Sequence, residues 1–139
     1  MSTILITGAS GGLAQEMVKL LPNDQLILLG RNREKLAQLY GNHLQAELVE
    51  IDITDPQAIE ELVAELYQRY GKIDVLINNA GYGIFEDFDK ISDQDIHQMF
   101  EVNTFALMNL SRLVAARMKE IRKGHIINIV SMAGLIATG

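Results

Sequence analysis

Short apolar runs alternate with segments of helical periodicity from one end of the chain to the other. Most of the apolar runs lack the in/out alternation of a half-exposed strand, and near-continuous apolar strands are typical of a parallel sheet that helices cover on both faces. We therefore predict an α/β fold with a doubly wound, Rossmann-type parallel sheet of five strands. The predicted strands are Thr3–Thr7, Gln25–Gly30, Leu48–Ile53, Asp74–Asn78 and His125–Val130.

Two of the intervening segments carry signals for the ends of helices. An apolar stripe with helical spacing covers Ile59–Tyr70. Asp55 is its predicted N-cap and Gly71 marks its end. The last helix is predicted over Ser92–Arg122, with serine as the cap.

The length of 139 residues suits one domain, which we expect to span residues 1–139. The last predicted strand, His125–Val130, is apolar, and nine residues follow it. Those nine residues are too few for a covering helix, and a bare apolar edge strand favours aggregation. We therefore expect the domain to be truncated on its C-terminal side.

Composition excludes several classes of function. The formal net charge of −6 argues against a nucleic-acid binder. Cysteine is absent, which excludes disulfides and thiolate sites, and the three histidines have no ligand spacing, so no metal is predicted. No apolar run approaches the ~20 residues of a membrane span. The first residues do not resemble a secretory signal, so a cytoplasmic protein is expected.

The segment Thr7–Ala14 forms a glycine-rich turn between the first strand and the first helix. Gly8 permits a tight turn there, and Gly12 lets the backbone approach a pyrophosphate. The helix N-terminus then offers free amide groups to the phosphates. A nucleotide triphosphatase loop is excluded because its Gly-Lys-Ser/Thr ending is missing. The alternative is a flexible turn with no ligand.

The end of the second strand bears on the choice of dinucleotide. Gly30 is followed by Arg31 and Arg33, where an NAD-selective site would carry an acidic residue. Arginine there favours NADP(H), with NAD(H) as the second candidate. The alternative is that both arginines are solvated charges beside the next helix, with Asn32 as its cap. Glu34 lies close enough to weaken the distinction.

The sequence Asn78-Asn79-Ala80-Gly81 ends the fourth predicted strand, where two amide side chains need partners. With this motif the chain resembles the short-chain dehydrogenase/reductase family, which has Asn-Asn-Ala-Gly here and Thr-Gly-x-x-x-Gly-x-Gly at the start. Ala14 replaces the last glycine of that turn. The resemblance covers the whole chain, with its motifs in the family's order.

The resemblance implies a cofactor site and a role for each of its residues. Arg31 would meet the 2′-phosphate of NADP, and Asp52 with the Ile53 backbone would hold the adenine. Asn79 and the two residues after it would lie beside the nicotinamide ribose, whereas Asn78 would brace the sheet. The implied cofactor-binding residues are Gly8, Ser10, Gly11, Gly12, Leu13, Arg31, Asp52, Ile53, Asn79, Ala80 and Gly81.

The resemblance also implies two residues of the catalytic machinery. Asn103, on the apolar stripe of the last helix, would anchor a water in a proton relay; the alternative is a sheet-bracing or helix-kinking amide. Ser131 would hydrogen-bond the substrate oxygen; the alternative is a turn or capping residue. The family's acid/base tyrosine and its lysine have no counterpart in this sequence after Ser131, so we predict that the 139-residue chain itself is inactive.

The implied function is that of an NADP(H)-dependent oxidoreductase, which moves a hydride between nicotinamide and a small-molecule carbonyl or secondary alcohol. The alternative is a non-catalytic nucleotide-binding or interaction module. The resemblance also implies a homo-oligomer that packs through the Ser92–Arg122 helix. Phe105 and Met108 would suit such a contact, although core packing explains them nearly as well.

Overall fold

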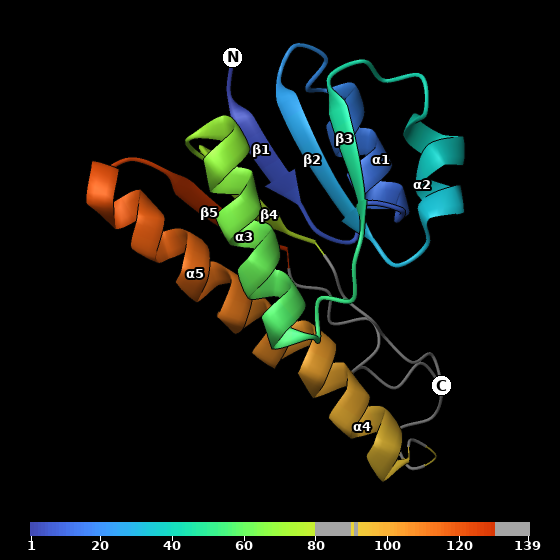
Figure 1. The fold of residues 1–139 in the computed structure, drawn as a ribbon. Helices are drawn as coiled ribbons and strands as arrows, with labels where there is room; N and C mark the ends of the chain where they lie inside the picture. The colour runs from blue at the N-terminus through green and yellow to red at the C-terminus, as the bar shows by residue number, and fades with distance from the viewer. Residues whose placement is uncertain (80–89, 91, 130–139) are drawn as a thin grey trace.

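A computed structural model describes residues 1–79, 90 and 92–129, without the side chains of residues 102 and 103. Its sheet has five parallel strands in the order β3-β2-β1-β4-β5. The chain thus winds outward from β1 in both directions, which confirms the predicted doubly wound sheet (Figure 1). The strands are β1 (Thr3–Ile6), β2 (Gln25–Gly30), β3 (Ala46–Glu50), β4 (Val75–Asn78) and β5 (His125–Asn128).

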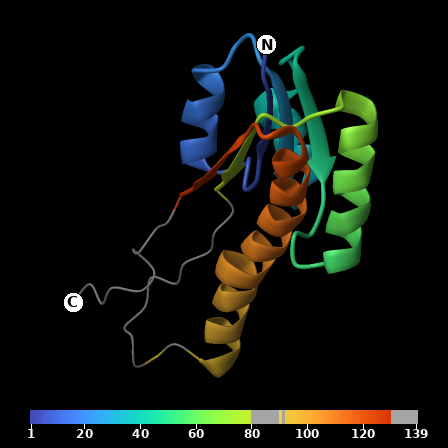
Figure 2. The same ribbon diagram turned by 90° about the vertical axis from the view of Figure 1, so that its left-hand side faces the viewer.

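Helices cover both faces of the sheet (Figure 2). On one face, α1 (Gly12–Lys19) and α2 (Arg33–Tyr40) pack against a cluster that includes Ile4 and Ile6. On the other face, α3 (Pro56–Tyr70) and α5 (Ala106–Ile121) pack against a cluster that includes Leu5. Adjacent β1 residues therefore enter opposite cores, which explains why Ile4, Leu5 and Ile6 are all apolar.

The ends of α3 lie where the sequence predicts them. The Asp55 side chain accepts hydrogen bonds from the backbone N–H groups of Gln57 and Ala58, both at 3.2 Å. Gly71 ends the helix with a φ of 78°, and its N–H donates to the Tyr67 carbonyl at 2.9 Å. Both predicted caps are confirmed.

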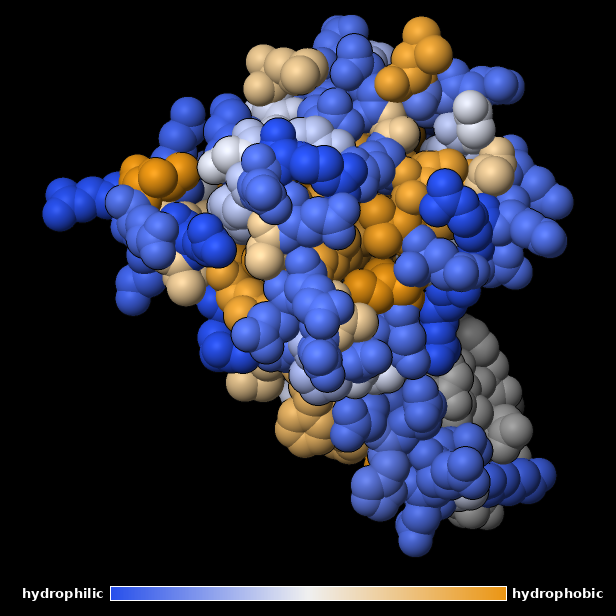
Figure 3. Space-filling model, in the orientation of Figure 1, coloured by the Kyte–Doolittle hydropathy of each residue, from blue (hydrophilic) through white to orange (hydrophobic). Residues whose placement is uncertain are grey.

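The third strand differs from its prediction at both ends. It begins at Ala46, which pairs with Leu26, and it ends at Glu50 rather than Ile53. After Glu50, the Ile51 N–H still donates to the Gly30 carbonyl at 2.9 Å, and the Asp52 carboxylate then accepts from the N–H of Thr54, a local hydrogen bond that competes with strand pairing. Between α3 and β3 the molecule leaves part of its apolar surface visible (Figure 3), and β3 is correspondingly only half-buried.

The predicted last helix consists of three pieces. These are α4 (Asp93–Phe100), a π-helical turn η2 (Glu101–Phe105) and α5, which ends at Ile121. The extra residue in a π-turn changes which side chains share a face, and α4 extends beyond the carboxyl ends of the strands (Figures 1 and 2). Ile96 and Phe100 belong to this extension and are 38% and 53% exposed.

The fifth strand differs from its prediction in burial. It pairs only with β4 in the described sheet, and its side chains are mostly exposed, in contrast to the buried strand that its composition predicts. The reason is its position at the edge of the sheet, with α5 covering one face. Among the described helices, none is long and apolar enough to cross a membrane.

Candidate functional site

The glycine-rich turn follows β1 and leads into α1 at the carboxyl edge of the sheet. Gly8 has a φ of 61°, a left-handed conformation that glycine adopts without strain. Two backbone hydrogen bonds shape the turn: Ala9 N–H donates to the Leu29 carbonyl of β2 at 2.9 Å, and Gly11 N–H donates to the Gly8 carbonyl at 3.2 Å. The turn is therefore tied to the neighbouring strand.

Within the described part of the chain, no side chain caps the N-terminus of α1. Its N-cap residue, Gly11, makes no side-chain capping hydrogen bond, and the first turn contains no acidic residue. Gly12 has helical backbone geometry, and a Cβ atom placed on it would meet no atom within 4 Å. Neither the backbone conformation nor the packing of the fold therefore requires glycine at this position. The absence of a side chain leaves space in front of the first amide groups of the helix.

Arg31 and Asp52 lie at the carboxyl ends of the adjacent strands β2 and β3, and both are exposed. Hydrogen bonds from the Thr54 hydroxyl, at 2.6 Å, and the Thr54 N–H, at 2.9 Å, lower the pKa of Asp52. Burial raises this pKa by a smaller amount, and the positive charge of Arg31, the smallest of these effects, lowers it. Asp52 is therefore a carboxylate acceptor at neutral pH. Ile53, next to it, packs against the core on the α3 side.

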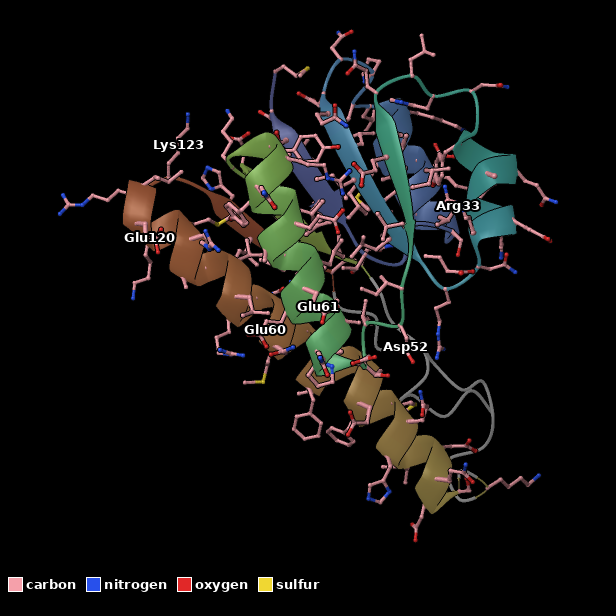
Figure 4. The ribbon with its side chains drawn as sticks, in the orientation of Figure 1. Arg33, Asp52, Glu60, Glu61, Glu120 and Lys123 are labelled. Atoms are coloured by element: carbon pink, nitrogen blue, oxygen red, sulfur yellow. The ribbon has the colours of Figure 1, made fainter. Side chains whose placement is uncertain are left out.

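Arg33, the second arginine after β2, contacts β3 (Figure 4). Arg33 donates from its guanidinium to the Leu48 carbonyl at 3.4 Å, and its N–H donates to the Glu50 carboxylate at 3.0 Å. Asn32 caps α2 by accepting from the Lys35 N–H, as the alternative interpretation of this segment predicts. Arg33 thus belongs to the contact between α2 and β3, which leaves Arg31 as the candidate for a phosphate.

Glu50 is a residue of this region that the sequence analysis missed. It pairs with Gly30 across the β2–β3 ladder, so its carboxylate lies near the start of α2. The register between β2 and β3 places the Glu50 carboxylate there. The sequence offers one signal for this contact, an acidic residue at the end of a strand. Gly30 itself is small for a packing reason, because a Cβ there would lie 3.0 Å from a Leu36 methyl group.

The paired asparagines after β4 connect different parts of the site. Asn79 N–H donates to the Thr7 hydroxyl at 2.9 Å, and its side-chain amide donates to the Gly8 carbonyl at 3.1 Å. Asn78 is 1% exposed, and its amide donates to Ser111 of α5 and Asn128 of β5, both at 2.9 Å. Asn79 therefore supports the glycine turn, and the predicted bracing role of Asn78 is confirmed.

Replacing Asn78 with alanine should destabilise the chain without weakening nucleotide binding. The change removes two buried hydrogen bonds and leaves Ser111 and Asn128 without this donor, so the free energy of unfolding should fall by about 1–3 kcal/mol. Urea denaturation measures this fall. The exposed Asn42→Ala variant is the control and should unfold like the wild type. Equal stability of all three proteins would contradict the bracing role.

The remaining candidates fall on residues that are described incompletely or not at all. Ala80, Gly81 and Ser131 lie outside the described residues. The backbone of Asn103 lies in the π-turn η2, a kind of turn that occurs frequently at functional sites, but its side chain is not described. Within the described part of the chain, no group of three or more His, Asp or Glu residues is placed to hold a metal ion.

Comparisons with known proteins agree with this geometry. A family model described as short chain dehydrogenase matches residues 2–138. An uncharacterized oxidoreductase of Staphylococcus saprophyticus is 36% identical over 136 residues, which cover 94% of this chain and 55% of that protein. An NADP-dependent 3-hydroxy acid dehydrogenase of Escherichia coli K12 is 34% identical over 137 residues, which cover 94% of this chain and 54% of that protein.

Solved structures show the same fold. The crystal structure of a metagenomic short-chain oxidoreductase in complex with NADP has a TM-score of 0.88 and 29% identity, and the match covers 99% of this chain and 66% of that one. The chain spans about half the length of the curated relatives it matches.

Proposed function

Because the chain belongs to the short-chain dehydrogenase family, we propose that it forms the dinucleotide-binding part of an NADP(H)-dependent oxidoreductase. The N-terminus of α1 at Gly12 carries this proposal, since no side chain among the described residues caps it and a Cβ on Gly12 would meet no atom within 4 Å, which gives room for a pyrophosphate. The site lies where the strand order reverses between β1 and β4, the position at which doubly wound sheets bind ligands.

The residues around α1 fit such a cofactor along its length. The amide groups of Ser10, Gly12 and Leu13 would bind the pyrophosphate, and the Asp52 carboxylate would accept a hydrogen bond from the adenine amine. Asn79 holds the glycine turn from the side where the nicotinamide ribose would lie. When bound, the nicotinamide gives a hydride to a carbonyl carbon or takes one from a secondary alcohol.

Arg31 favours NADP(H) over NAD(H) in this proposal. It is the exposed cation at the end of β2, and the Arg33 guanidinium is directed toward β3. The Escherichia coli relative is named as NADP-dependent, and the metagenomic relative was solved with NADP. Glu50 and Glu34 are the charges that oppose this preference, because either carboxylate would repel a 2′-phosphate.

For the chemical step we propose that Ser131 orients the substrate oxygen and that Asn103, in the π-turn, anchors a water. The sequence contains no Tyr-x-x-x-Lys pair. Among the described tyrosines, Tyr40 is buried under the glycine turn, and Tyr67 and Tyr70 lie on α3.

The 139-residue chain should therefore bind NADPH without oxidising it. Positioned proton transfer contributes roughly 10²–10⁴-fold to a rate, and residues 1–139 lack the group that would supply it. The measurement is NADPH fluorescence for binding and absorbance for turnover, with a panel of small ketones and aldehydes as substrates. Turnover by the purified chain would contradict the assigned acid/base chemistry. Absence of NADPH binding would contradict the proposed function itself.

We also propose that the protein forms a homo-oligomer through α4, η2 and α5. Phe100, Phe105 and Met108 follow one another along these helices, and each is more than half exposed. Large apolar side chains gathered on one exposed surface favour a protein contact. Core packing, the alternative explanation for Phe105 and Met108, does not account for their exposure among the described residues.

A further inference from the structure

We propose that Tyr40 is a positioning residue for the dinucleotide. It acts indirectly, by fixing the glycine turn that would bind the pyrophosphate. The inference rests on the proposed function, and it adds a residue outside the cofactor contacts. Tyr40 is the last residue of α2 and is 6% exposed. Its hydroxyl donates to the Ala9 carbonyl at 2.6 Å, over a separation of 31 residues in the chain.

The hydrogen bond from Tyr40 completes the fixation of Ala9. The N–H of Ala9 already donates to the Leu29 carbonyl of β2 at 2.9 Å, and Ala9 is fully buried. Both peptide groups of this residue are therefore held by elements outside the turn. Ser10, Gly11 and Gly12 follow directly, so the orientation of Ala9 sets where their amide groups point.

The same helix begins at the other end of the proposed cofactor site. Its cap, Asn32, follows Arg31, and Leu36 packs against Gly30 at the end of β2. This short helix thus begins just after Arg31, the proposed 2′-phosphate contact, and its last residue holds the pyrophosphate turn. Because the two contacts lie at opposite ends of α2, a change at Tyr40 should weaken the pyrophosphate contact and leave the 2′-phosphate contact unchanged.

Any buried tyrosine needs an acceptor for its hydroxyl, so burial alone does not distinguish a positioning role from ordinary core packing. The identity of the acceptor makes this distinction, because the Ala9 carbonyl belongs to the glycine turn and not to a strand or helix. Burial raises the pKa of Tyr40, so the phenol stays a neutral donor at any pH used for nucleotide binding.

Tyr40→Phe tests this role, because it removes one oxygen atom and keeps the ring that packs in the core. Two probes separate the two ends of the site: NADPH, which contains the pyrophosphate, and adenosine 2′-monophosphate, which lacks it. We expect the Kd of NADPH to rise by roughly 3- to 10-fold, the effect of one lost hydrogen bond. The Kd of adenosine 2′-monophosphate should be unchanged, which also shows that the variant is folded.

Tyr70→Phe is the matched control, since the Tyr70 hydroxyl donates to Glu47 in a contact between α3 and β3, on the opposite face of the sheet. It should bind both probes like the wild type. Equal NADPH affinity for wild type and Tyr40→Phe would overturn the inference. So would an equal loss for both probes, which would indicate a general disturbance of α2. Failure of the wild type to bind NADPH would instead overturn the proposed function.

Discussion

The Gly12→Asp variant should lose NADPH binding by at least roughly 100-fold while remaining as stable as the wild type. Gly12 is the first residue of α1, and a side chain there would enter open space. A carboxylate in the first turn of a helix is favourable, by about 0.3–1 kcal/mol at the surface. The same carboxylate would occupy the proposed pyrophosphate site and repel the pyrophosphate. NADPH affinity should therefore fall while the free energy of unfolding does not.

Gly12→Asn is the control for this experiment, because asparagine has nearly the same shape as aspartate and no charge. It should weaken NADPH binding less than Gly12→Asp, and the difference measures the repulsion. Calorimetric titration gives the two dissociation constants, and thermal unfolding without nucleotide gives the stabilities. Unchanged NADPH binding by Gly12→Asp would contradict the location of the pyrophosphate site.

Replacing Arg31 with glutamine should weaken NADPH binding by roughly 10- to 100-fold and leave NADH binding nearly unchanged. The variant loses a charge-assisted contact to the 2′-phosphate, a group that NADH does not have. Arg33→Gln removes the same charge two residues away, where the guanidinium is directed toward the Leu48 carbonyl. That control should change NADPH binding much less.

Titrations of NADPH and NADH into the three proteins measure this selectivity. A larger effect of Arg33→Gln than of Arg31→Gln would show that Arg33 turns toward the phosphate when nucleotide binds. An equal loss of NADPH and NADH affinity in Arg31→Gln would contradict a 2′-phosphate contact. Neither result would contradict the proposed pyrophosphate site at α1, because the proposed pyrophosphate contacts do not involve these arginines.

The layered fold could be predicted because its cause is local in the sequence. Ile4, Leu5 and Ile6 of β1 are each buried against one of two helical layers, so the strand carries an unbroken apolar run that predicts a parallel sheet. Asp55 and Gly71 cap α3 through contacts within a few residues, which a sequence also reveals. The glycine turn could be placed for the same reason, between a strand and a helix that both have clear periodicity.

The features that could not be predicted depend on contacts between distant residues. The π-turn η2 inserts one residue into a helix without any break in the pattern of side chains, so the sequence predicts one continuous helix over Ser92–Arg122. The Glu50 contact with Arg33 depends on strand register. Tyr40 looks like an ordinary core residue until its hydroxyl is seen to reach Ala9.

The titration of NADPH into the wild-type chain, followed by nicotinamide fluorescence, tests the central claim most directly. We predict one saturable site for each chain, with NADH binding at least roughly tenfold more weakly in a parallel titration, as expected for loss of a charged hydrogen bond. No saturable binding of either dinucleotide at millimolar concentration would contradict the claim that the α1 N-terminus is a cofactor site.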